Sequence, residues 1–175
     1  MRRWLLTVGL LVVVAAAAYW LLIRDTTLEV ELRPPRATAT IGTGEDIVAV
    51  DPEGQILAWL PLADDLQLPS LPLSTPPASG RLAGPVLQQA RVLGAAPATL
   101  RPYIERSYYG ESGVDVVLRS GIELRFGEAS QATTKWKAAA AVLADPSITA
   151  LDYVDLRAPR RPAWGGSGHT LPPVE

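Results

Sequence analysis

Few residues in this sequence have the chemistry of a catalytic or metal-binding group. The 175 residues include no Cys and a single His, His169, so a cysteine nucleophile and a thiolate or multi-histidine metal site are excluded. His169 lies close to Ser167 and Thr170, but the segment GGSGHTLPPVE predicts no framework that could fix a catalytic geometry. The adjacent Asp64 and Asp65 lie in a proline-rich loop without a third ligand, which is typical of solvated charge.

Four further carboxylates are the candidates for an envelope enzyme, if they converge in a polar pocket. They are Glu105, Glu111, Asp115 and Glu123, and they fall on or beside predicted strands that direct most of them to solvent. The sequence also has no glycine-rich phosphate loop and no G-x-S-x-G motif. We therefore expect no catalytic residues, no metal site, no cofactor and no small-molecule substrate. The net charge of -2 and the lack of a basic cluster argue against binding to nucleic acid.

An uncharged segment near the N-terminus, residues 4–23, predicts a transmembrane helix. At about 1.5 Å per residue, a helix of this length covers the roughly 30 Å hydrocarbon core. Two arginines precede it, which places residues 1–3 in the cytoplasm and the bulk of the chain across the membrane. The alternative is a cleaved signal peptide with its small residues at 15–18, but the apolar run continues past them to Ile23. We expect a single-pass anchor.

After this segment, short strand patterns alternate with proline and glycine. Residues 26–32 (TTLEVEL) alternate polar and apolar positions, as a half-buried strand does. Residues 46–50 and 55–60 flank the sequence DPEG, whose proline and glycine positions suit a type I turn, so they predict a hairpin. The proline-rich residues 61–85 predict an ordered, extended connection rather than a helix or a central strand.

The second half of the chain predicts two helices and several strands. The first helix begins at Gly84-Pro85 and ends near Leu93. The second, residues 130–144, is rich in alanine, ends before a proline, and carries Trp136 on its apolar face. Strands are expected at residues 104–109, 114–119 and 122–126, with the final strand at 148–156. The order indicates an α+β domain with an antiparallel or mixed, curved sheet and both helices on one face.

Five motifs in this order resemble the extracytoplasmic part of the bacterial cell-division family FtsQ, also called DivIB. They are TLEVELRPPRA (27–37), IVAVDPEGQIL (47–57), LRSGIELRFG (118–127), Lys135 of the second helix, and ITALDYVDLR (148–157). The resemblance implies an FtsQ-type β domain over residues 41–157, followed by a Pro/Gly-rich tail over residues 158–175. Members usually carry a POTRA domain between anchor and sheet, of which only a closing strand at residues 26–37 is expected here.

The resemblance also implies a function and a binding site. Family members are non-enzymatic scaffolds of the divisome that bind the small division proteins FtsB and FtsL and support septal cell-wall synthesis. In the family, the last strand and the residues just after its VDLR-like end receive a strand from FtsB, by β-augmentation of a sheet edge. Carried over to this sequence, the expected partner-binding residues are Tyr153, Val154, Asp155, Leu156, Arg157, Ala158 and Trp164.

Some of these residues have a simpler interpretation, and the chain as a whole has an alternative one. Asp155 and Arg157 could form a strand-end ion pair of little energetic value, and Tyr153 could pack within the sheet. Pro159 and Pro162 remove backbone donors, which would confine partner pairing mostly to the residues before Pro159. The alternative function is a secreted or anchored envelope enzyme or binding domain unrelated to division.

Overall fold

The computed structural model of the chain describes residues 36–43, 46–62 and 68–171. Several predicted features fall outside these ranges: cytoplasmic residues 1–3, the anchor at 4–23, all but the last two residues of the 26–37 segment, and the Asp64-Asp65 pair. In the ranges described, no helix has both the length and the apolar character needed to cross a membrane.

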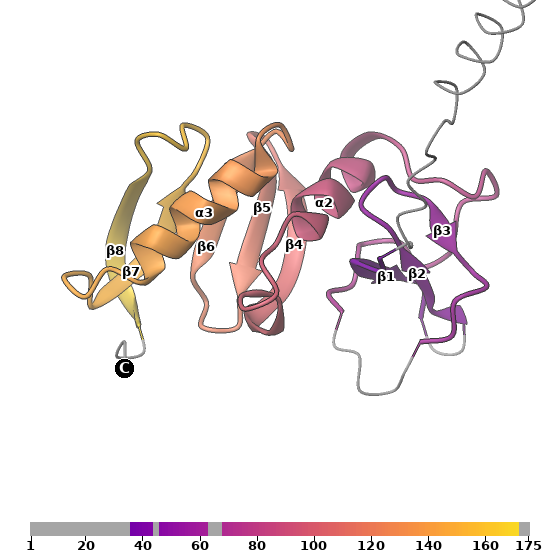
Figure 1. Cartoon of the computed structure of the whole chain (residues 1–175), viewed down its shortest axis with the longest axis horizontal. Helices are drawn as coiled ribbons and strands as arrows, with labels where there is room; N and C mark the ends of the chain where they lie inside the picture. The colour runs from indigo at the N-terminus through magenta and orange to yellow at the C-terminus, as the bar shows by residue number, and fades with distance from the viewer. Residues whose placement is uncertain (1–35, 44–45, 63–67, 172–175) are drawn as a thin grey trace, which may run out of the picture. The chain divides into compact units, whose positions relative to one another are not determined.

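The described residues after Pro35 belong to one unit with eight strands in two sheets and two α-helices (Figure 1). The elements in chain order are β1 (Ala39–Ile41), β2 (Val48–Val50), β3 (Ile56–Leu57), α2 (Gly84–Gly94), the 3-10 turn η2 (Arg101–Tyr103), β4 (Ile104–Gly110), β5 (Gly113–Leu118), β6 (Glu123–Gly127), α3 (Ala132–Leu143), β7 (Ala150–Asp155) and β8 (Ala163–Thr170). The α+β class predicted from the sequence is confirmed.

The smaller sheet is antiparallel, in the order β1-β2-β3. Strands β2 and β3 form the predicted hairpin, and the Gly54 N–H donates to the Asp51 carbonyl at 3.0 Å within its turn. Gly54 has a φ of 81°, which glycine adopts without a Cβ clash. Strand β1 was not predicted, because three residues are too few to show a period. Beyond residue 67 the proline-rich connection first runs beside β1, where Ser70 bridges to Thr40. It then bends, and it turns where the Gly80 N–H donates to the Pro77 carbonyl, so it is ordered but not extended throughout.

The larger sheet is mixed, in the order β4-β5-β6-β7-β8. Its pairs are antiparallel except for β6 and β7, which run parallel. A parallel pair needs a crossover connection, and α3 supplies it. Helices α2 and α3 lie in contact with each other across one face of this sheet (Figure 1), as the sequence predicts. The single sheet expected from the sequence is instead two separate sheets.

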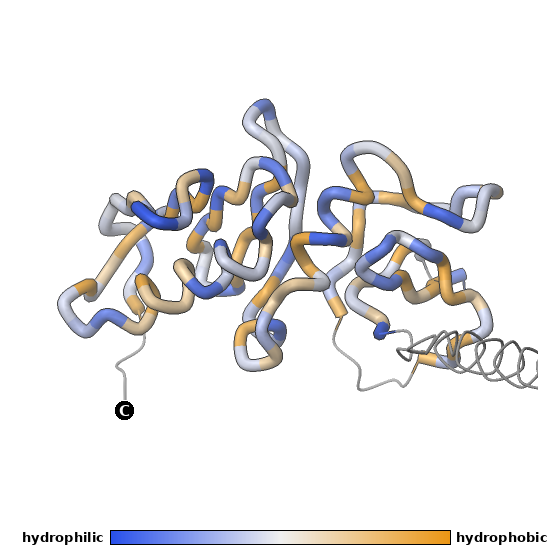
Figure 2. Tube along the Cα trace, turned by 45° about the horizontal axis from the view of Figure 1, so that its top comes forward, coloured by the Kyte–Doolittle hydropathy of each residue, from blue (hydrophilic) through white to orange (hydrophobic). Residues whose placement is uncertain are grey.

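Apolar side chains at helical spacing on α2 and α3 form the core with the larger sheet. Trp136 of α3 is fully buried and its ring centroid lies 4.8 Å from that of Phe126 on β6. Ala90 and Leu93 of α2 are buried in the same cluster. Figure 2 shows the alternation of apolar and polar residues along the chain that produces this buried layer.

The end of the chain differs from the sequence prediction. Residues 148–156 were expected to form the last strand, with a tail from residue 158, but Ala163–Thr170 form β8, antiparallel to β7. Strand β7 therefore has a neighbour on both sides and is not an edge strand. The sequence of β8, AWGGSGHT, does not predict a strand, because three glycines after a proline are typical of a loop.

Candidate functional site

Strand β8 is one of the two edge strands of the larger sheet, with β4 at the opposite edge, and its backbone has an outward side. The Leu156 N–H donates to the Arg125 carbonyl of β6 at 2.8 Å, so Leu156 and Val154 direct their backbone groups to β6. Because these groups alternate along a strand, Tyr153 and Asp155 of β7 direct theirs to β8. Their register partners on β8 therefore direct their own backbone N–H and C=O groups back to β7.

The residue that points its backbone outward at the start of β8 is Trp164. Tyr153 is paired with Gly165 and Asp155 with Ala163, and Trp164 lies between them, opposite Val154. Its N–H and C=O consequently face the open edge, where no described strand pairs with them. The residue is 48% exposed. A backbone donor, a backbone acceptor and an exposed indole thus meet at one position of the edge.

The structure separates the predicted partner-binding residues into three groups. Val154 and Leu156 are fully buried, so their side chains belong to the core. Tyr153 and Asp155 are half-buried on the sheet, and two exposed residues, Arg157 and Ala158, follow the end of β7. Trp164 alone lies on the edge strand. The expectation that the β7 residues themselves present an edge is wrong, because β8 covers them.

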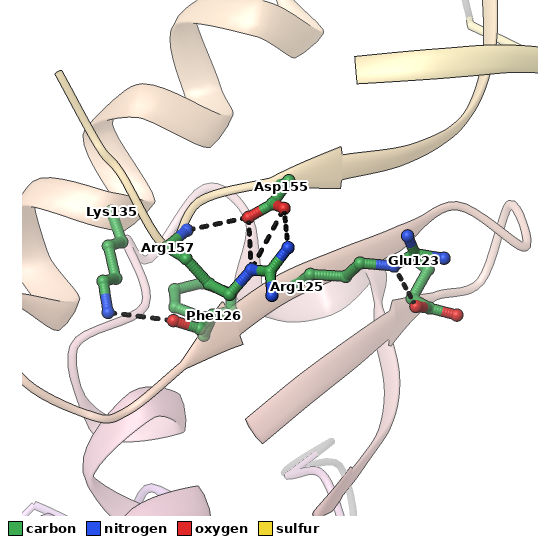
Figure 3. Close-up of polar contacts among 6 residues, drawn as sticks. All are labelled: Glu123, Arg125, Phe126, Lys135, Asp155 and Arg157. Atoms are coloured by element: carbon green, nitrogen blue, oxygen red, sulfur yellow. Dashed lines mark hydrogen bonds and ion pairs between the residues drawn. The ribbon is translucent and has the colours of Figure 1, made fainter. Parts of the chain in front are cut away.

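Asp155 and Arg157 form an ion pair at the end of β7 (Figure 3). The Arg157 Nε donates to both carboxylate oxygens of Asp155, at 3.0 and 3.1 Å, and the Arg157 backbone N–H adds a bond of 3.0 Å. The side-chain hydrogen bond from Arg157 holds the pKa of Asp155 below its usual range. The simpler interpretation of these two residues, a strand-end ion pair, is confirmed.

The end of β7 opens onto a shallow hollow of about 430 Å³. Its lining residues are Asp155, Arg157, Ala158, Arg161 and Ala163. Arg161 also lines a neighbouring hollow together with Arg160. Exposed arginines therefore surround the entry to β8, next to the residue whose backbone faces outward.

A comparison with protein families agrees with this architecture. The family described as "Cell division protein FtsQ/DivIB, C-terminal" matches residues 39–157, more than half of the chain. The chain belongs to the FtsQ/DivIB family. No curated protein was found that matches the sequence. FtsQ/DivIB is a non-enzymatic family of cell-division proteins, and the resemblance stated from the sequence motifs is confirmed.

One motif residue of the FtsQ/DivIB resemblance, Lys135, has a structural role. It is buried, and its Nζ donates to the carbonyl of Phe126 at 2.8 Å (Figure 3). The same Nζ also donates to the carbonyl of Glu128 at 2.8 Å. Burial lowers the pKa of this amine. Lys135 thereby joins the first turns of α3 to the end of β6, and so fixes the crossover that carries the chain into β7.

The four carboxylates considered for catalysis do not form one pocket in this FtsQ/DivIB domain. Asp115 and Glu123 lie on adjacent strands, and burial together with the charge of Glu123 raises the pKa of Asp115. Arg125 donates from Nε to Glu123 Oε1 at 2.6 Å. Glu105 and Glu111 are exposed, on β4 and in the turn that follows it. Among the described residues, no group of three or more His, Asp or Glu side chains could hold a metal ion.

The sequence did not indicate a role for the glycines of β8. Two residues of β7, Tyr153 and Asp152, explain why glycine is needed there. Gly165 lies against the Tyr153 ring, with the Tyr153 hydroxyl 3.1 Å from where a Cβ would be. The Gly168 N–H donates to Asp152 Oδ1 at 2.6 Å. A glycine within a strand often marks a bulge or a close approach of another group. The glycines could therefore have indicated a strand with a bulge, but a segment so rich in glycine is more typical of a loop.

Proposed function

We propose that this chain is a membrane-anchored scaffold of the divisome that binds FtsB- and FtsL-like division proteins and supports septal cell-wall synthesis. Its N-terminus would lie in the cytoplasm, residues 4–23 would anchor it in the plasma or inner membrane, and the FtsQ/DivIB domain would lie outside, at the division septum. Family membership supports the role in division. The apolar, uncharged segment supports the anchor.

The partner site we propose is the open edge of β8, with Trp164 at its centre. The supporting observation is that the backbone N–H and C=O of Trp164 face away from β7. An extended segment of an FtsB-like protein would add to this edge as a further strand, because main-chain hydrogen bonds supply affinity in β-augmentation. The exposed indole would supply side-chain contact, since Trp is enriched among residues that dominate binding energy.

Residues after the end of β7 would contact the part of the partner that precedes or follows the added strand. Arg157 and Ala158 line the hollow beside Ala163, the first residue of β8. Arg160 and Arg161 are exposed nearby and give this region positive charge. The partner segment would therefore carry an acidic side chain next to its extended part. Tyr153 and Asp155 would contribute by holding β8 in place through their backbone pairing, and Val154 and Leu156 by packing in the core and pairing with β6.

The experiment that tests this site compares two substitutions at one position. Trp164→Pro removes the outward N–H and the indole, whereas Trp164→Ala removes the indole and keeps the N–H. Binding of the extracytoplasmic segment of an FtsB-like protein is measured by titration calorimetry, after circular dichroism has shown that both variants are folded. We expect Trp164→Ala to weaken binding by about tenfold to a hundredfold, or about 1–3 kcal/mol, and Trp164→Pro to abolish it.

Equal binding by Trp164→Pro and the unchanged chain would overturn strand addition at β8. An equal loss of affinity in both variants would show that the partner binds through the indole alone and not by strand addition. Val154→Pro is a less specific test, because the Val154 backbone faces β6 and the substitution would disrupt the sheet itself. In cells, a chain carrying Trp164→Pro should reach the membrane and yet fail to support septation.

A further inference from the structure

The pairing of β7 and β8 changes register around Asp152. Tyr153 is paired with Gly165, whereas Leu151 is paired with His169. A single residue of β7, Asp152, therefore lies opposite residues 166–168 of β8. Such an insertion is a bulge with two extra residues, and bulges bend a strand and interrupt its pairing.

The Asp152 carboxylate occupies the inside of this bulge. Its Oδ1 accepts the hydrogen bond from the Gly168 N–H at 2.6 Å. A Cβ on Gly166 would overlap Oδ2, and a Cβ on Gly168 would lie 2.5 Å from Oδ1. Gly166 also has a φ of 88°, in the region that favours glycine. The bulge is therefore built by one carboxylate and two glycines that fit around it.

This bulge divides the open edge of β8 into two segments with different registers. Residues 163–165 form the first, and His169 and Thr170 form the second. The Leu171 N–H donates to the Thr149 carbonyl at 3.0 Å, so the neighbouring Thr170 directs its backbone outward, as Trp164 does in the first segment. A regular partner strand can follow one segment but not both, because it has no matching insertion.

We propose that Asp152 limits strand addition at β8 to residues 163–165, and so determines which partner segments this chain accepts. The inference rests on the proposed partner site. The favoured segment is the one with Trp164, because it offers three residues and an exposed indole, whereas the second offers two residues beyond the bulge. The fitting partner is a short extended peptide that leaves the edge after Gly165, rather than a long regular strand. Bulges that interrupt an edge also protect it against pairing with other sheets.

The test uses the unchanged chain and a synthetic peptide covering the extracytoplasmic segment of an FtsB-like protein. Amide hydrogen exchange is followed by NMR at Trp164 and Thr170, with and without the peptide. We expect exchange at the Trp164 N–H to slow by about tenfold or more on binding, and exchange at the Thr170 N–H to stay the same. Slowing at both residues would overturn the limit while leaving strand addition intact. A peptide that binds without slowing Trp164, or that does not bind, would overturn the proposed site and the limit with it.

A second chain tests the role of Asp152 itself. Deletion of Gly166 and Ser167, combined with Asp152→Thr, would bring Gly168 opposite position 152 and make the register continuous. In this variant, extending the peptide by four residues should tighten binding by about threefold to tenfold, because each added cross-strand pair contributes. The same extension should change binding to the unchanged chain by less than about twofold. Equal gains in both chains would overturn the role of Asp152. If the variant does not fold, the exchange at Thr170 in the unchanged chain still tests the limit to residues 163–165.

Discussion

The indole Nε1 of Trp136 donates a hydrogen bond of 2.8 Å to the backbone oxygen of Val92. This bond joins the middle of α3 to the last turn of α2, and both side chains are fully buried. The same indole packs on Phe126 of β6. Because α3 is the crossover between β6 and β7, the position of β7 and of its neighbour β8 depends on this contact.

Replacement of Trp136 should therefore destabilise the whole domain. We expect Trp136→Ala to lower the free energy of unfolding by about 3–5 kcal/mol, through lost packing and an unpaired Val92 carbonyl. Urea denaturation followed by circular dichroism measures it. Trp59→Ala is the control, because Trp59 is 66% exposed, and a change within about 0.5 kcal/mol is expected there. Equal losses in the two variants would contradict the importance of this contact.

Gly166→Ala should cost more stability than Gly80→Ala, although both glycines have a positive φ. At Gly80 the new Cβ meets nothing within 4 Å, so only the backbone conformation costs energy, about 1–2 kcal/mol. At Gly166 the Cβ also meets the Asp152 carboxylate, and the loss should be larger by about 1 kcal/mol or more. In an Asp152→Ala background this excess should shrink. An excess that persists there would show that Asp152 does not shape the bulge.

Asp115→Asn should stabilise the domain at neutral pH. The pKa of Asp115 is raised from 3.8, first by burial and then by the charge of Glu123. A raised pKa in the folded state contributes stability that is complete below the unfolded value and is lost as the pH rises through the folded value. The gain from Asp115→Asn should therefore be present at pH 7 and disappear below about pH 3.8. Urea denaturation at pH 7 and pH 3 measures it, and a gain that is larger at pH 3 would contradict the assignment.

The Asp155 carboxylate should behave in the opposite way. Its pKa is lowered from 3.8, first by the side-chain hydrogen bond from Arg157. The associated stability is present above the unfolded pKa and is lost as the pH falls through the folded one. Arg157→Gln should destabilise the domain at pH 7 and make unfolding less sensitive to acid below about pH 3.8. Arg160→Gln, in the same loop, is the control, and an identical acid profile for the two variants would contradict the role of the pair.

The helices and most of the strands could be predicted from the sequence, because their signals are local. Gly84-Pro85 begins α2 and the proline after Asp145 limits α3, where backbone geometry itself forbids continuation. Alternating apolar residues marked the strand at Glu123–Gly127, since one of its faces is buried. Strand β1 escaped prediction because Ala39–Ile41 is too short to show a period.

The candidate site could be predicted only in part, because an edge is a property of the whole sheet. The sequence alone determined the family, through five motifs of which four lie within the matched residues 39–157, and it indicated the end of the chain as the place for a partner. Only the tertiary structure decided which strand is the edge. Strand β8 pairs with β7 despite its glycines, because Tyr153 packs over Gly165 and Asp152 bonds to Gly168. Those contacts cross the turn between two strands, and no pattern within β8 encodes them.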